Sequence, residues 1–176
     1  MKKIFLAVVV ALFSINAMAQ HEIGGIVGGL NGLSYKYWFN DNLALQADLA
    51  VGLTAAPGAW YYKGNKLNPT ATAHLYDFTI NPNALYHFDL VSNLQLYTGG
   101  GISFGLLSDI NNTRSEGIFG KFGINAIVGL AYELGAVPLV LAFDFRPGYG
   151  LGFQTADEAH MSFFDWKIAF AIRYRF

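Results

Sequence analysis

The most suggestive chemical group in the sequence is His160-Met161-Ser162, close to the C-terminus. A histidine beside a serine hydroxyl can activate that hydroxyl as a nucleophile when a carboxylate orients the histidine. Few carboxylates could orient His160, because no glutamate follows Ser162 and Asp165 is the only acidic residue after it. The sequence therefore favours a protein without enzymatic activity and keeps an enzyme as an alternative.

Other reactive residue types are scarce. The chain has no cysteine, which excludes disulfides, thiol chemistry and lipid attachment to cysteine. His74 and His87 are isolated, and no pair of histidines has the spacing of metal ligands. No phosphate-binding loop is present. We therefore predict neither a metal nor any other cofactor.

Charged residues are sparse enough for each to be informative. Charges that are enclosed together need partners of opposite sign. The forked guanidinium of Arg146 can bind two carboxylates, which makes this residue the predicted hub of a network. Glu133, Arg173 and Arg175 are predicted to form a second cluster. The predicted network has four cations and four anions: Lys36, Asp48, Asp77, Lys121, Asp144, Arg146, Asp165 and Lys167.

The C-terminal segment WKIAFAIRYRF indicates which elements position these charges. From Trp166 to Phe176, apolar or aromatic residues alternate with charged or small ones. Such alternation is typical of a β-strand that has one face in an apolar medium. That medium is either the core of the protein or the hydrocarbon of a membrane.

The same alternation recurs along the chain and predicts an all-β protein with eight strands. Asn31-Gly32 is a typical two-residue hairpin turn and separates the first two strands. Tilted strands of about 9–11 residues cross a bilayer, and bacterial single-chain barrels have an even number of strands. The predicted strands cover 23–29, 33–39, 43–53, 76–88, 94–106, 122–134, 139–153 and 166–176.

Short and long links alternate between these strands. The links at 40–42, 89–93 and 135–138 are short, whereas those at 54–75, 107–120 and 154–162 are longer. Outer-membrane barrels have short periplasmic turns and longer outer loops. The pattern therefore predicts that both ends of the barrel domain lie on the periplasmic side.

Composition and the first residues indicate export to a membrane. The chain is 53% hydrophobic and only 13% charged, whereas soluble domains carry about 25% charged residues. Lys2 and Lys3, the apolar run 4–15 and Ala17-Met18-Ala19 match a secretory signal peptide that is cleaved before Gln20. An uncleaved anchor is the alternative, but a spanning helix needs about 20 apolar residues. We predict a signal peptide at 1–19 and a barrel domain at 20–176.

The sizes of the residues on each face favour lipid over a soluble core. The polar faces combine Gly, Ala, Ser and Asn with charges, which suits the crowded lumen of a narrow barrel. The apolar faces carry tyrosines near the strand ends, where aromatic rings settle at membrane interfaces. A soluble ligand-binding barrel would have its apolar residues inside. We therefore predict a closed, antiparallel, up-and-down transmembrane β-barrel.

The leader, the eight alternating strands and the terminal aromatic residue together resemble the small eight-stranded outer-membrane barrels of the OmpX and OmpA transmembrane-domain type. This resemblance implies that the barrel-assembly machinery reads the C-terminal strand as a signal. The positions that match are Phe170, Ile172, Tyr174 and Phe176. His160 and Ser162 are similar to the His-x-Ser pair of an outer-membrane lipid A deacylase, whose further glutamate is missing here.

Two other features carry expectations. Trp60, Tyr61 and Tyr62 lie together in the first long link and are candidates for binding an extracellular surface ligand; their alternative role is to cap the barrel mouth. Pro82 and Pro147 fall inside predicted strands, where each removes a ladder hydrogen bond. We expect a β-bulge at each proline.

The sequence thus predicts an integral protein of the outer membrane of a Gram-negative-type bacterium, with a plugged polar lumen and a structural or surface-interaction role. The alternatives are a lipid-modifying enzyme and a narrow channel. The predicted partners are outer-membrane lipids, the barrel-assembly machinery and a surface ligand. The chain has a net charge of −1 and no basic patch, so we predict no nucleic-acid partner, and we predict a monomer.

Overall fold

The computed structural model describes residues 21–57, 60–63, 66–69, 72–109, 118–154 and 159–176. The predicted signal peptide lies outside these residues. Within the described ranges, no helix is long and apolar enough to span a membrane.

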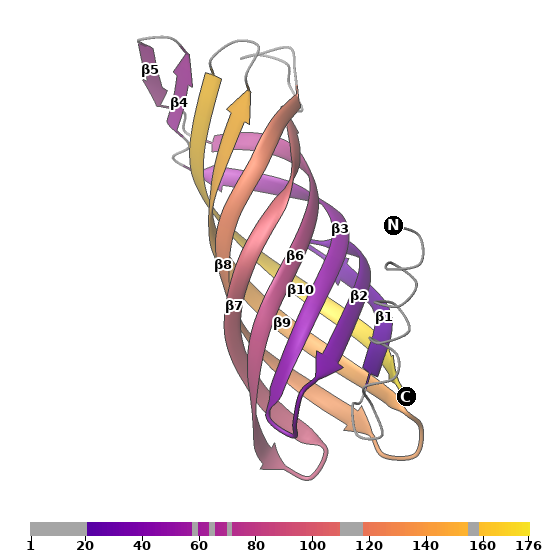
Figure 1. Ribbon diagram of the computed structural model, residues 1–176. Helices are drawn as coiled ribbons and strands as arrows, with labels where there is room; N and C mark the ends of the chain where they lie inside the picture. The colour runs from indigo at the N-terminus through magenta and orange to yellow at the C-terminus, as the bar shows by residue number, and fades with distance from the viewer. Residues whose placement is uncertain (1–20, 58–59, 64–65, 70–71, 110–117, 155–158) are drawn as a thin grey trace, which may run out of the picture.

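The described residues form ten β-strands in one antiparallel sheet that curls into a closed barrel (Figure 1). Eight of them build the wall in the order β1-β2-β3-β6-β7-β8-β9-β10, and β1 also pairs with β10. The remaining two, β4 and β5, form a hairpin at one end of the barrel. The strands are β1 His21–Gly28, β2 Asn31–Trp38, β3 Leu43–Pro57, β4 Trp60–Lys63, β5 Lys66–Pro69, β6 Thr72–Val91, β7 Leu94–Asp109, β8 Ile118–Leu134, β9 Leu139–Gln154 and β10 Ala159–Arg175.

Closure is made by the first and last strands. β1 and β10 pair from Glu22 opposite Arg175 to Gly28 opposite Ala169. Beyond this ladder, the backbone N–H of His21 donates to the carbonyl of Phe176 at 3.0 Å, and the reverse bond measures 2.9 Å. A closed sheet leaves no edge in this part of the wall, as hydrocarbon requires. The predicted closed antiparallel eight-stranded barrel is confirmed.

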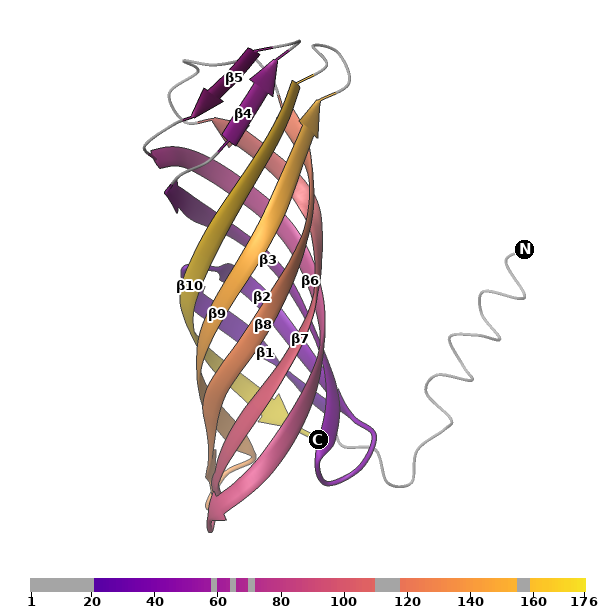
Figure 2. The same cartoon turned by 90° about the vertical axis from the view of Figure 1, so that its left-hand side faces the viewer.

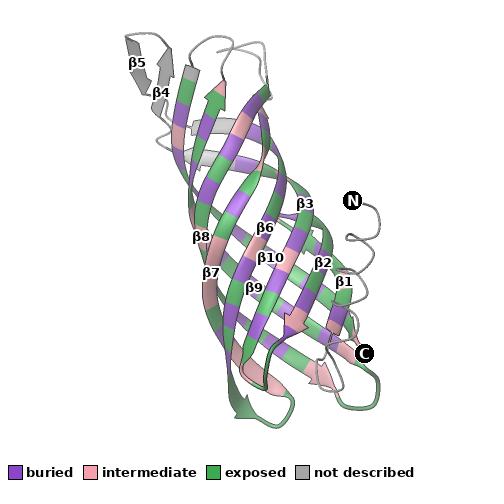
Figure 3. Ribbon diagram, viewed as in Figure 1, coloured by how far each residue is buried: buried purple, intermediate pink, exposed green. Residues whose placement is uncertain are grey.

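Burial alternates from one residue to the next along most of the length of the long strands (Figure 3). Phe143 and Phe170 are 40% and 54% exposed, whereas Asp144, the next residue of β9, is fully buried. Lys167, which alternates with exposed residues on β10, is only 8% exposed. Apolar side chains therefore cover the outside of the cylinder, and charged side chains are enclosed within it.

The first turn lies earlier than the sequence predicted. β1 ends at Gly28 and β2 starts at Asn31, so Asn31-Gly32 belongs to a strand. Gly28 has a φ of 121°, a conformation that favours glycine. The Asn31 side chain accepts a hydrogen bond from the Gly28 N–H and donates one to the Gly28 carbonyl. Asn31 thus stabilises the turn with its side chain and not as a central turn residue.

The expected bulges at Pro82 and Pro147 are wrong. The register is the same on both sides of each proline, and Asn81 and Asn83 both remain buried beside Pro82. Each proline keeps its place in one ladder, Pro82 opposite Ala47 and Pro147 opposite Trp166. Pairing is interrupted only toward the other neighbouring strand, so a proline is tolerated without an inserted residue. The register shift between β6 and β7 occurs instead near their turn, between Asp89 and Val91.

The wall has two tiers beside β10. β1 and β2 have eight residues each, whereas the other six wall strands have 15 to 20. β4 pairs antiparallel with β10 further up, with Trp60 opposite Ser162 and Lys63 opposite Ala159. This hairpin falls within a segment for which the sequence predicted a loop. β1 and β4 both run antiparallel to β10 along the same edge. β1 pairs with residues 169–175 of β10 and β4 with residues 159–162.

Apolar residues also fill parts of the interior. One buried cluster, toward the β4–β5 end, consists of Leu75, Leu107, Phe119, Met161 and Phe163. A second and larger cluster lies among the small residues of the closed part of the wall, and it includes Ile26, Leu85, Tyr97 and Ile127. The lumen is therefore a packed core that holds charges and apolar groups together.

Candidate functional site in the barrel lumen

Arg146 is the centre of the first group of charges. Its Nη1 lies 2.6 Å from Asp48 Oδ2 on β3, and its Nε donates to Asp144 Oδ2 at 3.0 Å. Its Nη2 also contacts Asp144. Gln46 donates to both oxygens of Asp48, at 3.2 and 2.9 Å. The structure therefore joins three of the predicted network residues through one guanidinium that crosses the lumen.

Two lysines share one carboxylate in the second group. Asp77 Oδ2 lies 2.5 Å from Lys121 Nζ and 3.3 Å from Lys167 Nζ. Thr54 Oγ1 donates to the same oxygen at 3.2 Å, and Lys167 also pairs with Asp165. These residues come from four different strands. A buried network of this kind ties the wall together from inside, because each charge has a partner of opposite sign.

A third group closes the end of the lumen that holds the chain termini. Arg175 binds Glu22 at 2.6 Å and Glu133 at 2.5 Å. The indole N–H of Trp38 donates to the same Glu22 oxygen at 2.9 Å. Glu133 and Arg175 were predicted to share an inner cluster, whereas Glu22 was not predicted to belong to it. Its position one residue before the first predicted strand concealed its place in the lumen.

Lys36 departs from the predicted pairing. Its side chain is fully buried, and no described carboxylate lies within ion-pair distance of its Nζ. The ammonium instead contacts His87 Nε2 at 3.3 Å and lies 4.7 Å from the centre of the Tyr97 ring. His87 itself is held by Gln95 at 3.1 Å and stacks on Tyr97. Cation–π contact takes the place of an ion pair here.

Arg173 is not part of the ion-pair cluster with Glu133 and Arg175 that was predicted for it. Its Nε donates to Ser34 Oγ at 2.9 Å, and the residue is fully buried. Its Nη1 and Nη2 have no hydrogen-bond partner among the described residues. Buried polar groups of this kind are the usual partners of internal water. Among the described residues, Asp77 Oδ1 and Asp144 Oδ1 of the other two groups also lack a hydrogen-bond partner.

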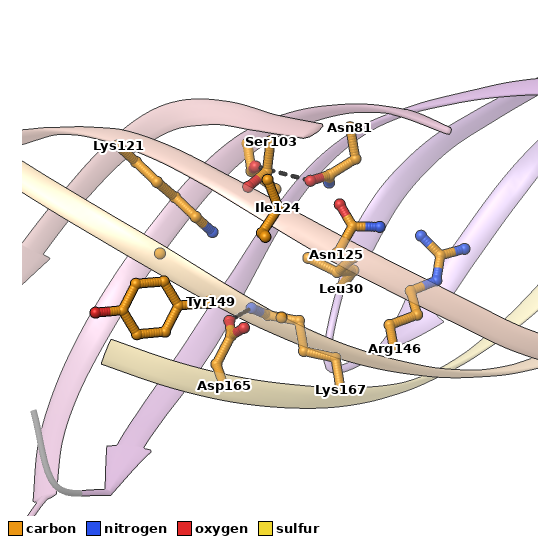
Figure 4. A pocket seen from close by; sticks show the side chains of 13 residues that line it. Leu30, Asn81, Ser103, Lys121, Ile124, Asn125, Arg146, Tyr149, Asp165 and Lys167 are labelled. Atoms are coloured by element: carbon orange, nitrogen blue, oxygen red, sulfur yellow. Dashed lines mark hydrogen bonds and ion pairs between the residues drawn. The ribbon is translucent and has the colours of Figure 1, made fainter. Parts of the chain in front are cut away.

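One cavity lies among these networks (Figure 4). It is bordered by Arg146 of the first group, by Lys121, Asp165 and Lys167 of the second group, and by Leu30 from the first turn. Figure 4 shows Lys167 beside Asp165 on one side of it and Lys121 on another. Its volume of about 30 Å³ is enough for two or three water molecules, since a water needs about 10–15 Å³. This cavity has no room for a larger solute.

The structure separates the residues of the enzyme alternative. His160 is exposed and Ser162 is partly exposed, both at outward positions of β10. Asp165 is buried and turned into the lumen, where it pairs with Lys167. No hydrogen bond joins His160 to Ser162 or to a carboxylate within the described part of the chain. Asp165 thus does not orient His160.

Metal binding finds no support in the described strands and turns. They contain no group of three or more His, Asp or Glu side chains that could hold a metal ion. His87 is occupied by Gln95 and Lys36, and His21 Nδ1 is bonded to the Tyr35 hydroxyl at 2.7 Å.

The other predicted sites lie at opposite ends of the barrel. The segment with Trp60, Tyr61 and Tyr62 forms β4 on the upper edge of β10, while its side chains lie outside the described part. The C-terminal residues are all exposed at outward positions: Phe170, Ile172, Tyr174 and Phe176. Phe176 stacks on His21 with ring centres 5.4 Å apart, so the terminal aromatic also contacts the first described residue.

Comparison of the fold with solved structures finds outer-membrane barrels. OprG from Pseudomonas aeruginosa is 13% identical, with a TM-score of 0.56, and the match covers 90% of this chain and 95% of that one. A major outer membrane protein from Thermus thermophilus is 13% identical, with a TM-score of 0.53 and coverages of 90% and 100%. The N-terminal barrel domain of Pseudomonas aeruginosa OprF is 18% identical, with a TM-score of 0.50 and coverages of 90% and 96%.

The fold is that of a small outer-membrane β-barrel. At these identities the likeness concerns the fold alone. No family model matches the chain, and no curated protein does. The exposed apolar belt of this barrel agrees with the shared fold, because such a belt is stable only against lipid. The predicted outer-membrane location is confirmed on these two grounds.

Proposed function

We propose that this outer-membrane barrel has no enzymatic activity, passes no solute and serves as a rigid membrane platform for its outer end. In this role the lumen supplies stability, and the loops and the β4–β5 hairpin contact partners at the cell surface. The same proposal includes a monomer and recognition of the C-terminal strand by the barrel-assembly machinery.

The packing of side chains inside the lumen supports this proposal. Arg146 reaches across the lumen to Asp48, and Asp77 binds Lys121 and Lys167. Three cations and their carboxylate partners therefore lie within the lumen. The Leu75–Phe163 cluster fills the part toward β4 and β5. An eight-stranded barrel has an interior just wide enough for side chains to fill. A continuous water path for ions would require these ion pairs to separate.

Planar-bilayer recording tests the plug directly. The refolded barrel is expected to give no stepwise conductance above that of the protein-free bilayer. The paired substitutions Arg146→Ala and Lys167→Ala shorten two side chains that occupy the lumen and should admit measurable current. Steady single-channel openings by the unaltered barrel would show that the lumen is a channel and contradict the proposal.

The absence of enzymatic activity is tested at the outward rim of β10. The proposal is supported by the inward position of Asp165, which leaves His160 and Ser162 without the carboxylate of a serine nucleophile. We expect no release of fatty acid from vesicles of acylated glycolipid. Release by the unaltered barrel that is lost in both His160→Ala and Ser162→Ala would establish the enzyme instead.

A further inference from the structure

A hollow lies on the outer face of β6, β7 and β8, toward the end of the barrel that carries β4 and β5. Its volume is about 240 Å³. In Figure 2 the β4–β5 hairpin lies at the upper end of the barrel and the C-terminus at the lower end. The outward-facing residues that line the hollow are Val51, Tyr76, Phe78, Leu106, Ser108 and Ile118.

The register of three strands accounts for the hollow. Ser108 on β7 lies opposite Tyr76 on β6 and opposite Ile118 on β8. Because neighbouring strands are about 4.7–4.9 Å apart, the two large residues are separated by about 9–10 Å, with only a serine between them. One row further from the β4–β5 end, Phe78 lies opposite Leu106. The short side chain of Ser108 thus leaves a space that its larger neighbours surround.

The hollow opens onto the lipid-facing belt. Tyr76 is 56% exposed and Ile118 is 62% exposed, whereas the intervening residues Asp77 and Leu107 are buried on the lumen side. The outer belt of an outer-membrane barrel meets the hydrocarbon of the membrane. The hollow is continuous with this belt, so the molecules that reach it are membrane lipids.

The two ends of the hollow differ in polarity. At the end nearer β4 and β5, Tyr76 and Ser108 lie opposite each other and both carry a hydroxyl group. Within the described part of the chain, neither side-chain hydroxyl has a hydrogen-bond partner. Each can therefore donate to a carbonyl oxygen. Toward the middle of the barrel, Val51, Phe78 and Leu106 supply only hydrocarbon.

The size of the hollow limits the occupant to part of a lipid. Pockets that enclose a whole drug-sized ligand have about 300–1,000 Å³. The hollow is smaller, at about 240 Å³. An acyl chain with its carbonyl linkage is the part of a lipid that has an acceptor at one end and a continuous apolar tail.

We propose that the hollow binds one acyl chain of a lipid in the leaflet that surrounds the β4–β5 end. The carbonyl oxygen of the chain accepts hydrogen bonds from the hydroxyls of Tyr76 and Ser108, and the tail lies over Phe78 and Leu106. The site is independent of the proposed surface role, because it requires only the barrel and its membrane.

Photo-crosslinking in defined vesicles tests this site. p-Benzoylphenylalanine replaces Ile118 at the rim of the hollow or, as the matched control, Phe153, an exposed residue near the same end of β9. Each barrel is refolded into phosphatidylglycerol vesicles that contain a trace of tritiated phosphatidylcholine. The chains of this tracer are joined either by ester bonds or by ether bonds, which lack the carbonyl.

The proposal predicts a preference at one position only. We expect the probe at position 118 to capture the ester-linked lipid severalfold more than the ether-linked lipid, and the probe at position 153 to capture both alike. Equal ratios at the two positions would overturn the proposal. If the Ile118 replacement does not fold, the probe replaces Val51 on the opposite side of the hollow, with the same expected preference.

A second variant tests the two hydroxyls directly. Ser108→Ala combined with Tyr76→Phe removes both donors and leaves the hollow open. In this background the probe at position 118 should capture the ester-linked and ether-linked lipids alike. A preference that persists would show that these hydroxyls do not bind the carbonyl, and would contradict the proposal.

Discussion

Arg146 on β9 and Asp48 on β3 meet across the lumen at 2.6 Å, although 98 residues separate them in the chain. The same guanidinium also binds Asp144, so one side chain links two carboxylates inside the cylinder. Both partners are almost completely shielded from solvent. This relationship makes the lumen a structural core and leads to the first prediction.

Arg146→Met should destabilise the barrel strongly. Removing one partner of a buried pair leaves uncompensated charge, which costs about 3–5 kcal/mol. Here Asp48 and Asp144 would both lose their cation. Urea unfolding in vesicles measures the change in the free energy of unfolding. A change below about 1 kcal/mol, the range of exposed pairs, would mean that Arg146 is not the hub of a buried network.

The control for this prediction neutralises all three residues. Arg146→Met combined with Asp48→Asn and Asp144→Asn removes the stranded charges together with the cation. Replacing a whole buried ion cluster is often nearly neutral. The triple variant should therefore recover most of the stability lost by Arg146→Met. If the triple variant is no more stable than the single variant, lost packing of the arginine and not stranded charge accounts for the destabilisation.

Arginine on the outer belt should destabilise the barrel according to depth. Phe143 packs against Phe170 with ring centres 4.9 Å apart, midway along the apolar stripe of β10. Phe143→Arg is expected to cost about 2–4 kcal/mol, as at the bilayer midplane. Tyr174→Arg, near the end of the stripe, should cost about 0–1 kcal/mol. Equal effects in a folding titration would be at odds with a belt in lipid.

Gly99→Ala should block closure of the wall between β6 and β7. A Cβ at Gly99 would lie 2.0 Å from the backbone carbonyl oxygen of Ala84, a distance that only a backbone shift can relieve. Gly25→Ala is the matched control, because its nearest atom would be 3.8 Å away. Electrophoresis with and without boiling should show the folded, heat-sensitive band for Gly25→Ala and little of it for Gly99→Ala. The same band intensity for both would contradict this geometry.

Phe176→Ala tests the C-terminal strand as an assembly signal. We expect less heat-sensitive barrel in the outer-membrane fraction of cells, with little loss of folding in pure lipid vesicles. Phe39→Ala, which removes another exposed aromatic residue, serves as the control. A defect of equal size in vesicles would assign Phe176 a packing role on His21 instead of recognition by the assembly machinery.

The strand pattern was predictable because a barrel in lipid enforces strict alternation. Phe143, Asp144 and Phe145 occupy the faces that their residue types predict. The β4–β5 hairpin was not predictable, because its four-residue strands are too short to show a period. The position of the first turn depended on side-chain bonds from Asn31 to Gly28, which no propensity rule describes.

The lumen was predictable in its membership but only partly in its pairing. Alternation identifies which charges point inward, and the fork of Arg146 favours two carboxylate partners. The choice between partners depends on strand shear, which brings Asp77 to Lys121 and leaves Lys36 with His87 and Tyr97. That shear is a property of the whole closed sheet, and local sequence does not determine it. Glu22 was missed for the related reason that the end of β1 is fixed by its pairing with β10.

The most direct test of the account measures which medium each face of β9 meets. Because the chain has no cysteine, single substitutions Leu141→Cys, Ala142→Cys and Phe143→Cys can each carry a nitroxide label in lipid vesicles. If the outer stripe of β9 lies in lipid, labels at 141 and 143 collide with oxygen dissolved in the lipid, whereas the label at 142 is shielded from both oxygen and a water-soluble relaxant. Labels at 141 and 143 that collide with the water-soluble relaxant and not with oxygen would contradict it.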